Sequence, residues 1–204
     1  MTQPRIIFAV PSTENVKAQF AVALASMGIA TVVKGIAVGV ASAQGCYISS
    51  NRNLLVDQAR EAQATHVMFL DSDMVFPPDT ALRLLAWDED IVGATYARRT
   101  PPYQSNLTLA PGTVVPPNGL VAAKVLPTGV MLVKLSVFDL LPRPWFFLSY
   151  DPKNPSPDYP DGLIGEDVHF CAGALRAGLK VYCDIGLSYQ IGHIAEQVVM
   201  LGEG

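Results

Sequence analysis

The sequence is poor in cysteine and in clustered basic residues. Its three cysteines, Cys46, Cys171 and Cys183, are odd in number and show no Cys-x-x-Cys spacing, which argues against a disulfide framework or a structural zinc site. The formal net charge is -4, and Arg98 and Arg99 form the only adjacent basic pair. A nucleic-acid-binding protein needs clustered lysine and arginine to displace counterions from phosphates, so we expect no nucleic-acid binding.

A long hydrophobic segment is also missing. The apolar run over residues 20–33 lies between Lys17 and Lys34, and it is shorter than the roughly 18 to 20 residues that cross a bilayer. The run over residues 6–10 is too short for the core of a signal peptide. We therefore expect a soluble, cytoplasmic protein with no membrane span and reduced thiols. With 204 residues, 50% of them hydrophobic, the chain suits one domain with a full core.

Strand-like and helix-like segments alternate through the first half of the chain. We expect strands over residues 5–10, 29–40, 66–70 and 91–94. We expect one helix that is capped by Ser12 or Thr13 and ends at Gly28, and two more over residues 51–64 and 77–87. This order predicts a parallel sheet with right-handed crossovers, in which ligands bind at the carboxyl ends of the strands. The predicted fold class is α/β and Rossmann-like, with a mostly parallel central sheet flanked by helices.

The second half is less regular. Residues 100–118 are rich in proline and turn residues, and a second loop covers residues 151–161. We expect a helix over residues 165–177 and short strands over residues 120–125, 130–134, 145–148 and 179–183. The expected organisation is a single domain, residues 1–204, with a nucleotide-binding half at residues 1–99 and a loop-rich half at residues 100–204.

An acidic pair directly follows the expected strand over residues 66–70. It consists of Asp71 and Asp73, with Ser72 between them. Two neighbouring carboxylates are costly unless a positive charge joins them. A divalent cation that bridges to a diphosphate meets this need, because hard cations bind carboxylate and phosphate oxygens together. An isolated pair of this kind also fits a cap on the following turn.

A second acidic pair, Glu166 and Asp167, begins the expected helix over residues 165–177. Carboxylates are common in the first turn of a helix because the helix dipole favours them, so this signal is weak by itself. The preceding loop would let the helix start face a pocket, where Asp167 would act as general base towards an acceptor hydroxyl. His193 is a candidate third protein ligand of the cation, although a lone histidine is more often structural. Carboxylate and imidazole together favour Mn²⁺ over Mg²⁺.

Further residues are candidates for binding a nucleotide. Pro11, Ser12 and Thr13 follow the first strand, where a base and ribose would lie. This loop matches neither the Gly-x-Gly-x-x-Gly nor the P-loop pattern, so dinucleotide binding and nucleotide hydrolysis are not supported. Arg52 near a helix start suits a diphosphate, and a solvated arginine fits equally well.

Two more positions carry weaker signals. Gly129 offers close backbone approach to a ligand, or marks a bulge. Trp145 offers a stacking wall for a sugar, while packing in the core is the commoner role for such a residue.

Several segments together resemble the GT-A glycosyltransferases, and in particular the small family 2-like enzymes of bacteria and their phages. The segments are the N-terminal strand with its Pro-Ser loop, Asn-Arg-Asn-Leu-Leu-Val, Phe-Leu-Asp-Ser-Asp-Met, Ile-Val-Gly-Ala-Thr-Tyr, Thr-Gly-Val-Met-Leu, Gly-Glu-Asp-Val-His-Phe-Cys and Gly-His. They occur in the expected order over nearly the whole chain, which is more specific than any single segment. The Gln-x-x-Arg-Trp pattern of processive synthases is absent from the sequence.

The resemblance implies a hexosyltransferase that uses a nucleotide-sugar donor, a UDP-sugar, and an acceptor hydroxyl of unknown identity. It implies that Asp71 binds the ribose or assists the metal, that Asp73 ligates the metal, and that His193 completes the protein ligands. It also implies that Asp167 is the base of an inverting reaction and that Glu166 binds acceptor. Residues 1–99 would then bind the nucleotide sugar, and residues 100–204 the acceptor.

Three alternatives stay open. A retaining GT-A enzyme would share the metal site. A sugar nucleotidyltransferase would need a glycine-rich basic loop after the first strand, and Val-Pro-Ser-Thr-Glu-Asn is not one. A non-catalytic module that binds nucleotide sugars would keep the fold without turnover.

Overall fold

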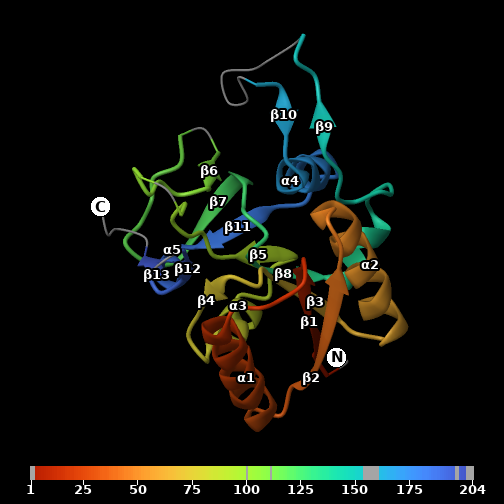
Figure 1. The fold of residues 1–204 in the computed structure, drawn as a ribbon, viewed down its shortest axis with the longest axis vertical. Helices are drawn as coiled ribbons and strands as arrows, with labels where there is room; N and C mark the ends of the chain where they lie inside the picture. The colour runs from red at the N-terminus through yellow and green to blue at the C-terminus, as the bar shows by residue number, and fades with distance from the viewer. Residues whose placement is uncertain (1–2, 100, 111, 154–160, 196–197, 201–204) are drawn as a thin grey trace.

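The computed structural model describes residues 3–99, 101–110, 112–153, 161–195 and 198–200 (Figure 1). Within these residues the central sheet has eight strands in the order β2-β1-β3-β8-β5-β11-β7-β6. In chain order these strands are β1 (Arg5–Ser12), β2 (Ala37–Gln44), β3 (His66–Leu70), β5 (Ile91–Gly93), β6 (Thr108–Leu109), β7 (Leu120–Val125), β8 (Val130–Lys134) and β11 (Val181–Asp184).

The sheet is mixed. β1 is parallel to both β2 and β3, and β5 is parallel to β11. β8 lies between β3 and β5 and is antiparallel to both, and β7 is antiparallel to β11 and to β6. The prediction of an α/β fold with helices around a central sheet is confirmed, and the sheet is mixed because β8 and β7 run opposite to the other strands. The sequence did not predict that β8 separates β3 from β5, because a short apolar run does not reveal its neighbours.

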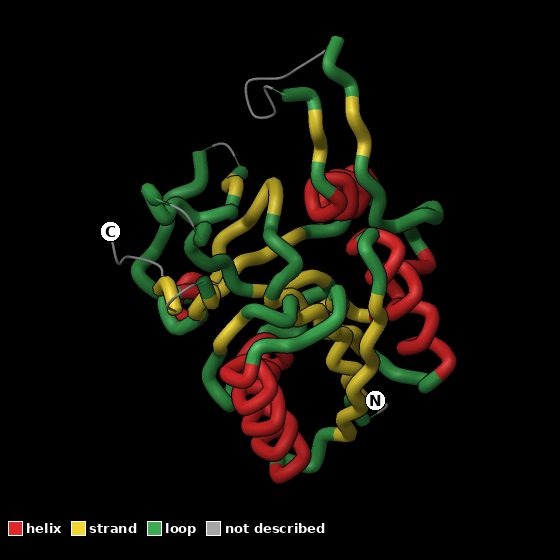
Figure 2. Tube along the Cα trace, viewed as in Figure 1, coloured by secondary structure: helices red, strands yellow, loops and turns green. Residues whose placement is uncertain are grey.

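Helices cover both faces of the sheet (Figure 2). Ile6 and Phe8 of β1 share a core with residues of α1 (Ala18–Val33) and α3 (Thr80–Ala86). Ile7 and Ala9, which point the other way, share a core with residues of α2 (Ile48–Glu61) and α4 (Glu166–Arg176). Burial on both faces explains why the central strands are apolar almost throughout.

The remaining elements are short. Two strands of a hairpin, β9 and β10, project from the body beside α4 (Figure 1). A small sheet has the order β13-β12-β4. The short elements are β4 (Met74–Val75), η1 (Leu135–Asp139), β9 (Ser149–Tyr150), β10 (Leu163–Ile164), α5 (Ile185–Ser188), β12 (Gly192–Ile194) and β13 (Val198–Met200).

The first helix differs from the prediction. It begins at Ala18 without a side-chain cap from Ser12 or Thr13, and it continues through Gly28 to Val33. Its end is fixed at Gly35, which has φ +80 and donates its N–H to the Val32 carbonyl at 2.8 Å. The predicted strand over residues 29–40 is therefore wrong in its first part, and β2 begins at Ala37.

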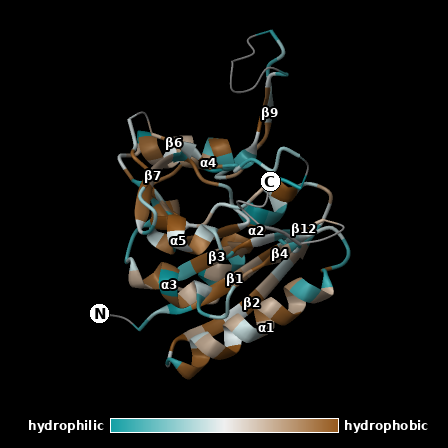
Figure 3. Cartoon of the chain, turned by 90° about the vertical axis from the view of Figure 1, so that its left-hand side faces the viewer, coloured by the Kyte–Doolittle hydropathy of each residue, from teal (hydrophilic) through white to brown (hydrophobic). Residues whose placement is uncertain are grey.

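Hydropathy explains this error. Figure 3 shows hydrophobic residues along much of α1. Phe20 and Met27 are buried against the sheet, yet Val22 and Ile29 are each 67% exposed on the outer side. A helix that is apolar on both sides lacks the one-sided pattern by which helices are recognised. Among the described residues no helix has the length and hydrophobicity needed to cross a bilayer.

Residues 145–148 do not form the predicted strand. The side chain of Asn53 makes the backbone hydrogen bonds that a neighbouring strand would otherwise make. Its Oδ1 accepts the backbone N–H groups of Trp145 at 3.0 Å and Phe146 at 3.3 Å, and its Nδ2 donates to the Phe146 carbonyl at 2.7 Å. Backbone groups satisfied in this way need no strand partner.

Other predicted elements are confirmed with small shifts at their ends. The strands over residues 66–70, 120–125 and 130–134 match the observed ones, and the helix over residues 165–177 matches α4 within a residue at each end. Of the two predicted loops, residues 100, 111 and 154–160 lie outside the described residues. The two halves of the chain interleave, because β8 and β11 of the second half pair with β3 and β5 of the first.

Candidate active site

The first acidic pair lies at one edge of the central sheet. β1, β3 and β5 point the same way, so their carboxyl ends meet at this edge. The Asp71 N–H donates to the Gly129 carbonyl at 3.0 Å, and the Met74 N–H donates to the Asp71 carbonyl at 3.2 Å. These bonds form a tight turn directly after β3, from which the side chains of Asp71 and Asp73 project.

The small sheet brings His193 beside Asp73. In the antiparallel pair of β12 and β4, His193 lies opposite Met74, and the Ile194 N–H donates to the Asp73 carbonyl at 2.8 Å. His193 Nδ1 lies 2.9 Å from the Ala97 carbonyl oxygen. Because a carbonyl only accepts, Nδ1 donates a hydrogen to Ala97, and the other ring nitrogen, Nε2, lies 3.5 Å from Asp73 Oδ2. Histidines that bind metals are typically oriented by such a bond from the second ring nitrogen.

Asp73 is held in its ionised form. Burial raises its pKa, but the contacts with His193 and with Arg99 outweigh burial, so the pKa of Asp73 is lowered. The Arg99 Nη1 atom lies 3.1 Å from Asp73 Oδ2. Asp73 is therefore an anion with two nitrogen partners at the same carboxylate oxygen.

The three predicted metal ligands are only partly brought together. In the part of the chain that the structure describes, no three histidine, cysteine, aspartate or glutamate side chains converge as a metal cluster. Asp73 and His193 are adjacent, while Asp71 is turned towards Arg52. One carboxylate and one imidazole fit a divalent cation whose other ligands come from phosphate and water.

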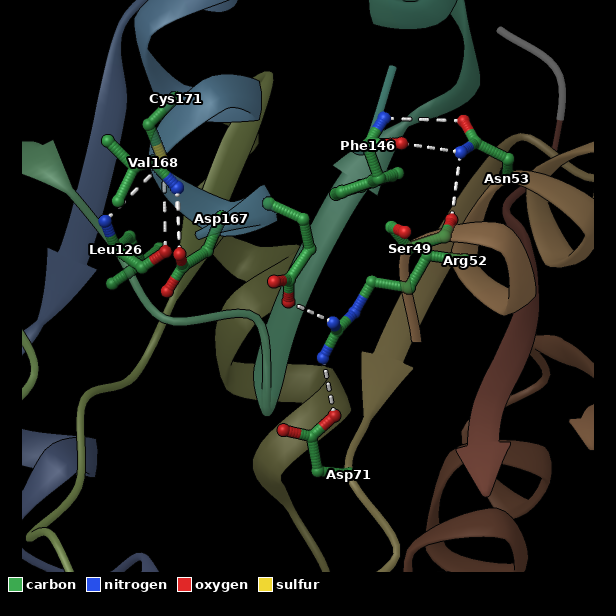
Figure 4. A network of polar contacts seen from close by, with 10 residues as sticks. Ser49, Arg52, Asn53, Asp71, Leu126, Phe146, Asp167, Val168 and Cys171 are labelled. Carbon is green, nitrogen blue, oxygen red and sulfur yellow. Dashed lines mark hydrogen bonds and ion pairs between the residues drawn. The ribbon is translucent and has the colours of Figure 1, made fainter. Parts of the chain in front are cut away.

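Arg52 joins the two acidic pairs (Figure 4). It lies in the second turn of α2 and is 1% exposed, which rules out the solvated arginine. Its Nη2 lies 2.7 Å from Asp71 Oδ1, and its Nη1 donates to Glu166 Oε1. Burial by itself lowers the pKa of Arg52, but the charges of Asp71 and Glu166 outweigh it, so the pKa is raised and the cation is kept. The sequence suggested that this guanidinium faces a diphosphate. In the structure it is bound to two protein carboxylates.

Glu166 and Asp167 begin α4, after Gly165. Asp167 Oδ1 accepts the Val168 N–H at 2.8 Å. Burial and the charge of Glu166 raise the pKa of Asp167 above its usual value. Burial also raises the pKa of Asp71, and the neighbouring Arg52 offsets only part of this effect.

A cavity of about 340 Å³ lies beside the first acidic pair. Of the residues proposed from the sequence for the donor or the metal, six line this cavity: Pro11, Ser12, Thr13, Asp71, Ser72 and Asp73. Arg52, Gly129 and His193 are not among the residues that line it. Asn51 and Arg99 also line it. Asn51 donates to the carbonyls of Ser12 and Gly45 and so ties the end of β1 to the loop after β2. Glu166 and Asp167 are not on this wall and connect to it through Arg52.

Gly129 has a packing role that the sequence did not specify. A Cβ added there would lie 2.3 Å from the Tyr96 hydroxyl. Tyr96 is 5% exposed, its ring meets the His193 ring edge-on at 5.2 Å, and burial and the charge of Asp71 raise its pKa well above the usual value. Gly129 therefore lets a tyrosine sit at the centre of the site.

The sequence reasoning missed Tyr96 and Arg99. Both follow the strand over residues 91–94, as Asp71 follows the strand over residues 66–70. Because parallel strands deliver their following residues to one edge, the argument used for Asp71 would have found them.

Trp145 is not at this site. Its indole N–H donates to the carbonyls of Phe138 at 3.0 Å and Leu141 at 3.2 Å. The guanidinium groups of Arg143 and Arg60 lie 4.5 Å and 5.1 Å from its ring centre. The indole is 5% exposed, and its surroundings are those of the core-packing alternative.

Fold and site together define an α/β protein with an ordered acidic site at the carboxyl edge of its sheet. No protein-family model matches the chain, and no curated protein matches it significantly in sequence. Its structure is similar to that of A197 from STIV, with 15% sequence identity and a TM-score of 0.60, over 98% of this chain and 95% of that one. This likeness shows a shared fold.

Two other similar structures are those of glycosyltransferases. One is involved in the glycosylation of the major capsid of PBCV-1, with 14% identity, a TM-score of 0.38 and 70% coverage of each chain. The other is a mutant Drosophila β1,4-galactosyltransferase 7 in complex with manganese, UDP-Gal and xylobiose. It is 13% identical with a TM-score of 0.47, over 94% of this chain and 71% of that one.

Proposed function

We propose that this chain is a divalent-metal-dependent glycosyltransferase that moves a hexose from a UDP-sugar to an acceptor hydroxyl with inversion at the anomeric carbon. The observation that carries the proposal is that one carboxylate of each acidic pair, Asp71 and Glu166, is bound to Arg52, at the edge of the sheet where Asp73 meets His193. A cavity beside Asp71 and Asp73, the contact of Asp73 with His193, and the link from Asp71 through Arg52 to Glu166 support it.

On the donor side, Asp73 and His193 would hold the cation, with Mn²⁺ preferred over Mg²⁺ because an imidazole is one of the ligands. The cation supplies positive charge for the diphosphate leaving group. Pro11, Ser12 and Thr13 would contact the base and ribose from the cavity wall. Asp71 would contact the ribose, and its position is fixed by Arg52. Ser72 and the Gly129 backbone would complete the donor contacts.

On the acceptor side, Asp167 would take the proton of the attacking hydroxyl. The hydroxyl oxygen then forms a bond with the anomeric carbon while the bond to the diphosphate breaks, and the nucleoside diphosphate leaves with that electron pair. A base works best when its pKa is near the working pH, and burial moves the pKa of Asp167 in that direction. Glu166 would contact the acceptor with the oxygen that Arg52 leaves free.

A donor screen tests this function without knowledge of the acceptor. The protein is incubated with Mn²⁺ and a panel of nucleotide sugars, and release of nucleoside diphosphate to water is measured by mass spectrometry. UDP is expected from a UDP-sugar. Asp167→Asn should lower the rate by about 10² to 10⁴-fold, the usual contribution of a general base. Binding of UDP with Mn²⁺ should persist, because an asparagine amide oxygen can still accept the Val168 N–H.

Controls separate the alternatives. Asp139→Asn changes an exposed carboxylate paired with Arg60 and should leave the rate unchanged. Asp73→Asn should abolish the metal dependence of UDP binding. Pyrophosphate exchange with a nucleoside triphosphate would instead support a nucleotidyltransferase, and UDP binding without any release would support a non-catalytic module. The anomeric configuration of the released sugar, read by NMR, distinguishes inversion from retention.

A further inference from the structure

One oxygen atom of Asp73 has two competing nitrogen partners. Asp73 Oδ2 lies 3.1 Å from Arg99 Nη1 and 3.5 Å from His193 Nε2. His193 is fixed by the Ala97 carbonyl, whereas the Arg99 side chain is 56% exposed. An exposed ion pair of this kind is weak and easily broken. Of the two partners, only Arg99 can leave Asp73 without disturbing the packed core.

A cation held by Asp73 and His193 would meet the same oxygen that Arg99 contacts. Two positive groups at one carboxylate oxygen repel each other, and a divalent ion doubles the repulsion. Arg99 therefore has to leave Asp73 when the cation arrives. The cation would bring the donor diphosphate into the same cavity. This diphosphate is an anion to which the displaced Arg99 can bind.

The residues of the cavity wall favour a position of Arg99 at the donor diphosphate. Among the described residues that line it, Arg99 is the only one with a basic side chain. Arg52, the other arginine near the site, is buried and occupied by Asp71 and Glu166. A guanidinium suits a diphosphate because its planar fork donates two hydrogen bonds to one phosphate.

We propose that Arg99 is an exchangeable counter-ion, which neutralises Asp73 in the empty site and binds the donor diphosphate once the cation has taken its place. The inference rests on the proposed function and deepens it. Its consequence is that Arg99 opposes binding of the cation alone and supports binding of the nucleotide with the cation.

Two titrations of Arg99→Gln test the exchange. Without the competing charge, Mn²⁺ alone should bind about two- to fivefold more tightly, the scale of one exposed ion pair. UDP in saturating Mn²⁺ should bind about tenfold more weakly or worse, since a charged hydrogen-bonding group is lost. Calorimetry measures both affinities, and electron paramagnetic resonance of free Mn²⁺ checks the first. Arg99→Lys keeps the positive charge but lacks the planar fork. Its Mn²⁺ affinity should therefore return to the weaker wild-type value, and its UDP affinity should recover only in part.

Arg98→Gln is the matched control. Arg98 Nε donates to Asn106 Oδ1 at 2.8 Å, and Arg98 is not on the cavity wall. It should change neither affinity. Unchanged affinities in Arg99→Gln, or changes of the same sign, overturn the exchange.

The outcome for the wild-type protein separates this inference from the proposed function. If wild type binds Mn²⁺ and UDP, and Arg99→Gln shows the opposed changes, the exchange stands even if no donor is ever turned over. If wild type binds neither, both the exchange and the proposed function fail.

Discussion

Arg52 is the largest of the side chains that are fully buried in the described part of the chain, and it is charged. A buried charge is tolerated only when it is paired, and here two carboxylates from different elements pair with one guanidinium. Asp71 follows β3 and Glu166 begins α4, so Arg52 fixes the distance between the two acidic pairs. Its guanidinium is therefore bound to one carboxylate of each pair.

Removing Arg52 should therefore weaken the whole fold. Arg52→Met leaves Asp71 and Glu166 unpaired, and breaking a buried pair in this way costs about 3 to 5 kcal/mol. The measurement is the free energy of unfolding in urea. Loss of Arg52 raises the pKa of Asp71 further above its unfolded value, so the variant's deficit should be largest near neutral pH and shrink as pH falls through that raised pKa.

A second substitution checks the cause. Asp71→Asn added to Arg52→Met removes one unpaired charge and should recover part of the lost stability. A double variant no more stable than Arg52→Met would show that packing, and not charge, is what Arg52 provides.

At the residue scale, the sequence predicted the positions of those residues that lie beside a predictable strand or helix. Asp71, Asp73 and Asp167 were found because each lies at the end of a strand or the start of a helix that could itself be predicted. The pairing of Arg52 with Glu166 could not be predicted, because it depends on how α2 packs near α4. The contact between His193 and Asp73 likewise depends on the pairing of two short strands, β12 and β4.

At the scale of elements, apolar runs were predicted best. β3, β7 and β8 were predicted to the residue because each is a short run bounded by polar or turn residues. The end of α1 was missed because a glycine was taken as a stop signal. Gly28 has no positive φ, and an added Cβ would only touch Phe8 Cε2 at 3.9 Å.

Two glycine substitutions should therefore have opposite effects. Gly28→Ala should stabilise the protein by about 0.5 to 1 kcal/mol, because alanine is the better helix former and the site has room. Gly35→Ala should destabilise it by about 1 to 2 kcal/mol, because φ +80 is unfavourable for a residue with a Cβ. Thermal or urea unfolding measures both. If Gly28→Ala were the more destabilising change, the helix would end where the sequence suggested.

At the scale of the whole molecule, the division into a donor half and an acceptor half does not correspond to separate folding units. β8 pairs with β3 on one side and β5 on the other, and β11 pairs with β5. A sequence does not show which strands become neighbours, and so the interleaving of the halves was not predictable. The carboxyl edge was predictable because it depends only on strand direction.

The protein should accordingly unfold in one cooperative transition. Trp87 and Trp145 are its two tryptophans, one in each half of the chain. Trp87→Phe and Trp145→Phe each leave a single fluorescent reporter, and in each variant fluorescence and far-UV circular dichroism should give the same urea midpoint. A fluorescence midpoint that precedes the dichroism midpoint in one variant would show that this half unfolds independently.

The place of β8 also has a consequence for synthesis. The ribosome synthesises β3 and β5 before β8, which begins only at Val130. During that interval the nascent chain carries two strands whose shared neighbour has not yet been made, and open strand edges recruit other chains. The edges of β3 and β5 that face β8 therefore stay open until residues 130–134 have been synthesised, and the other edge of β5 stays open until β11 follows.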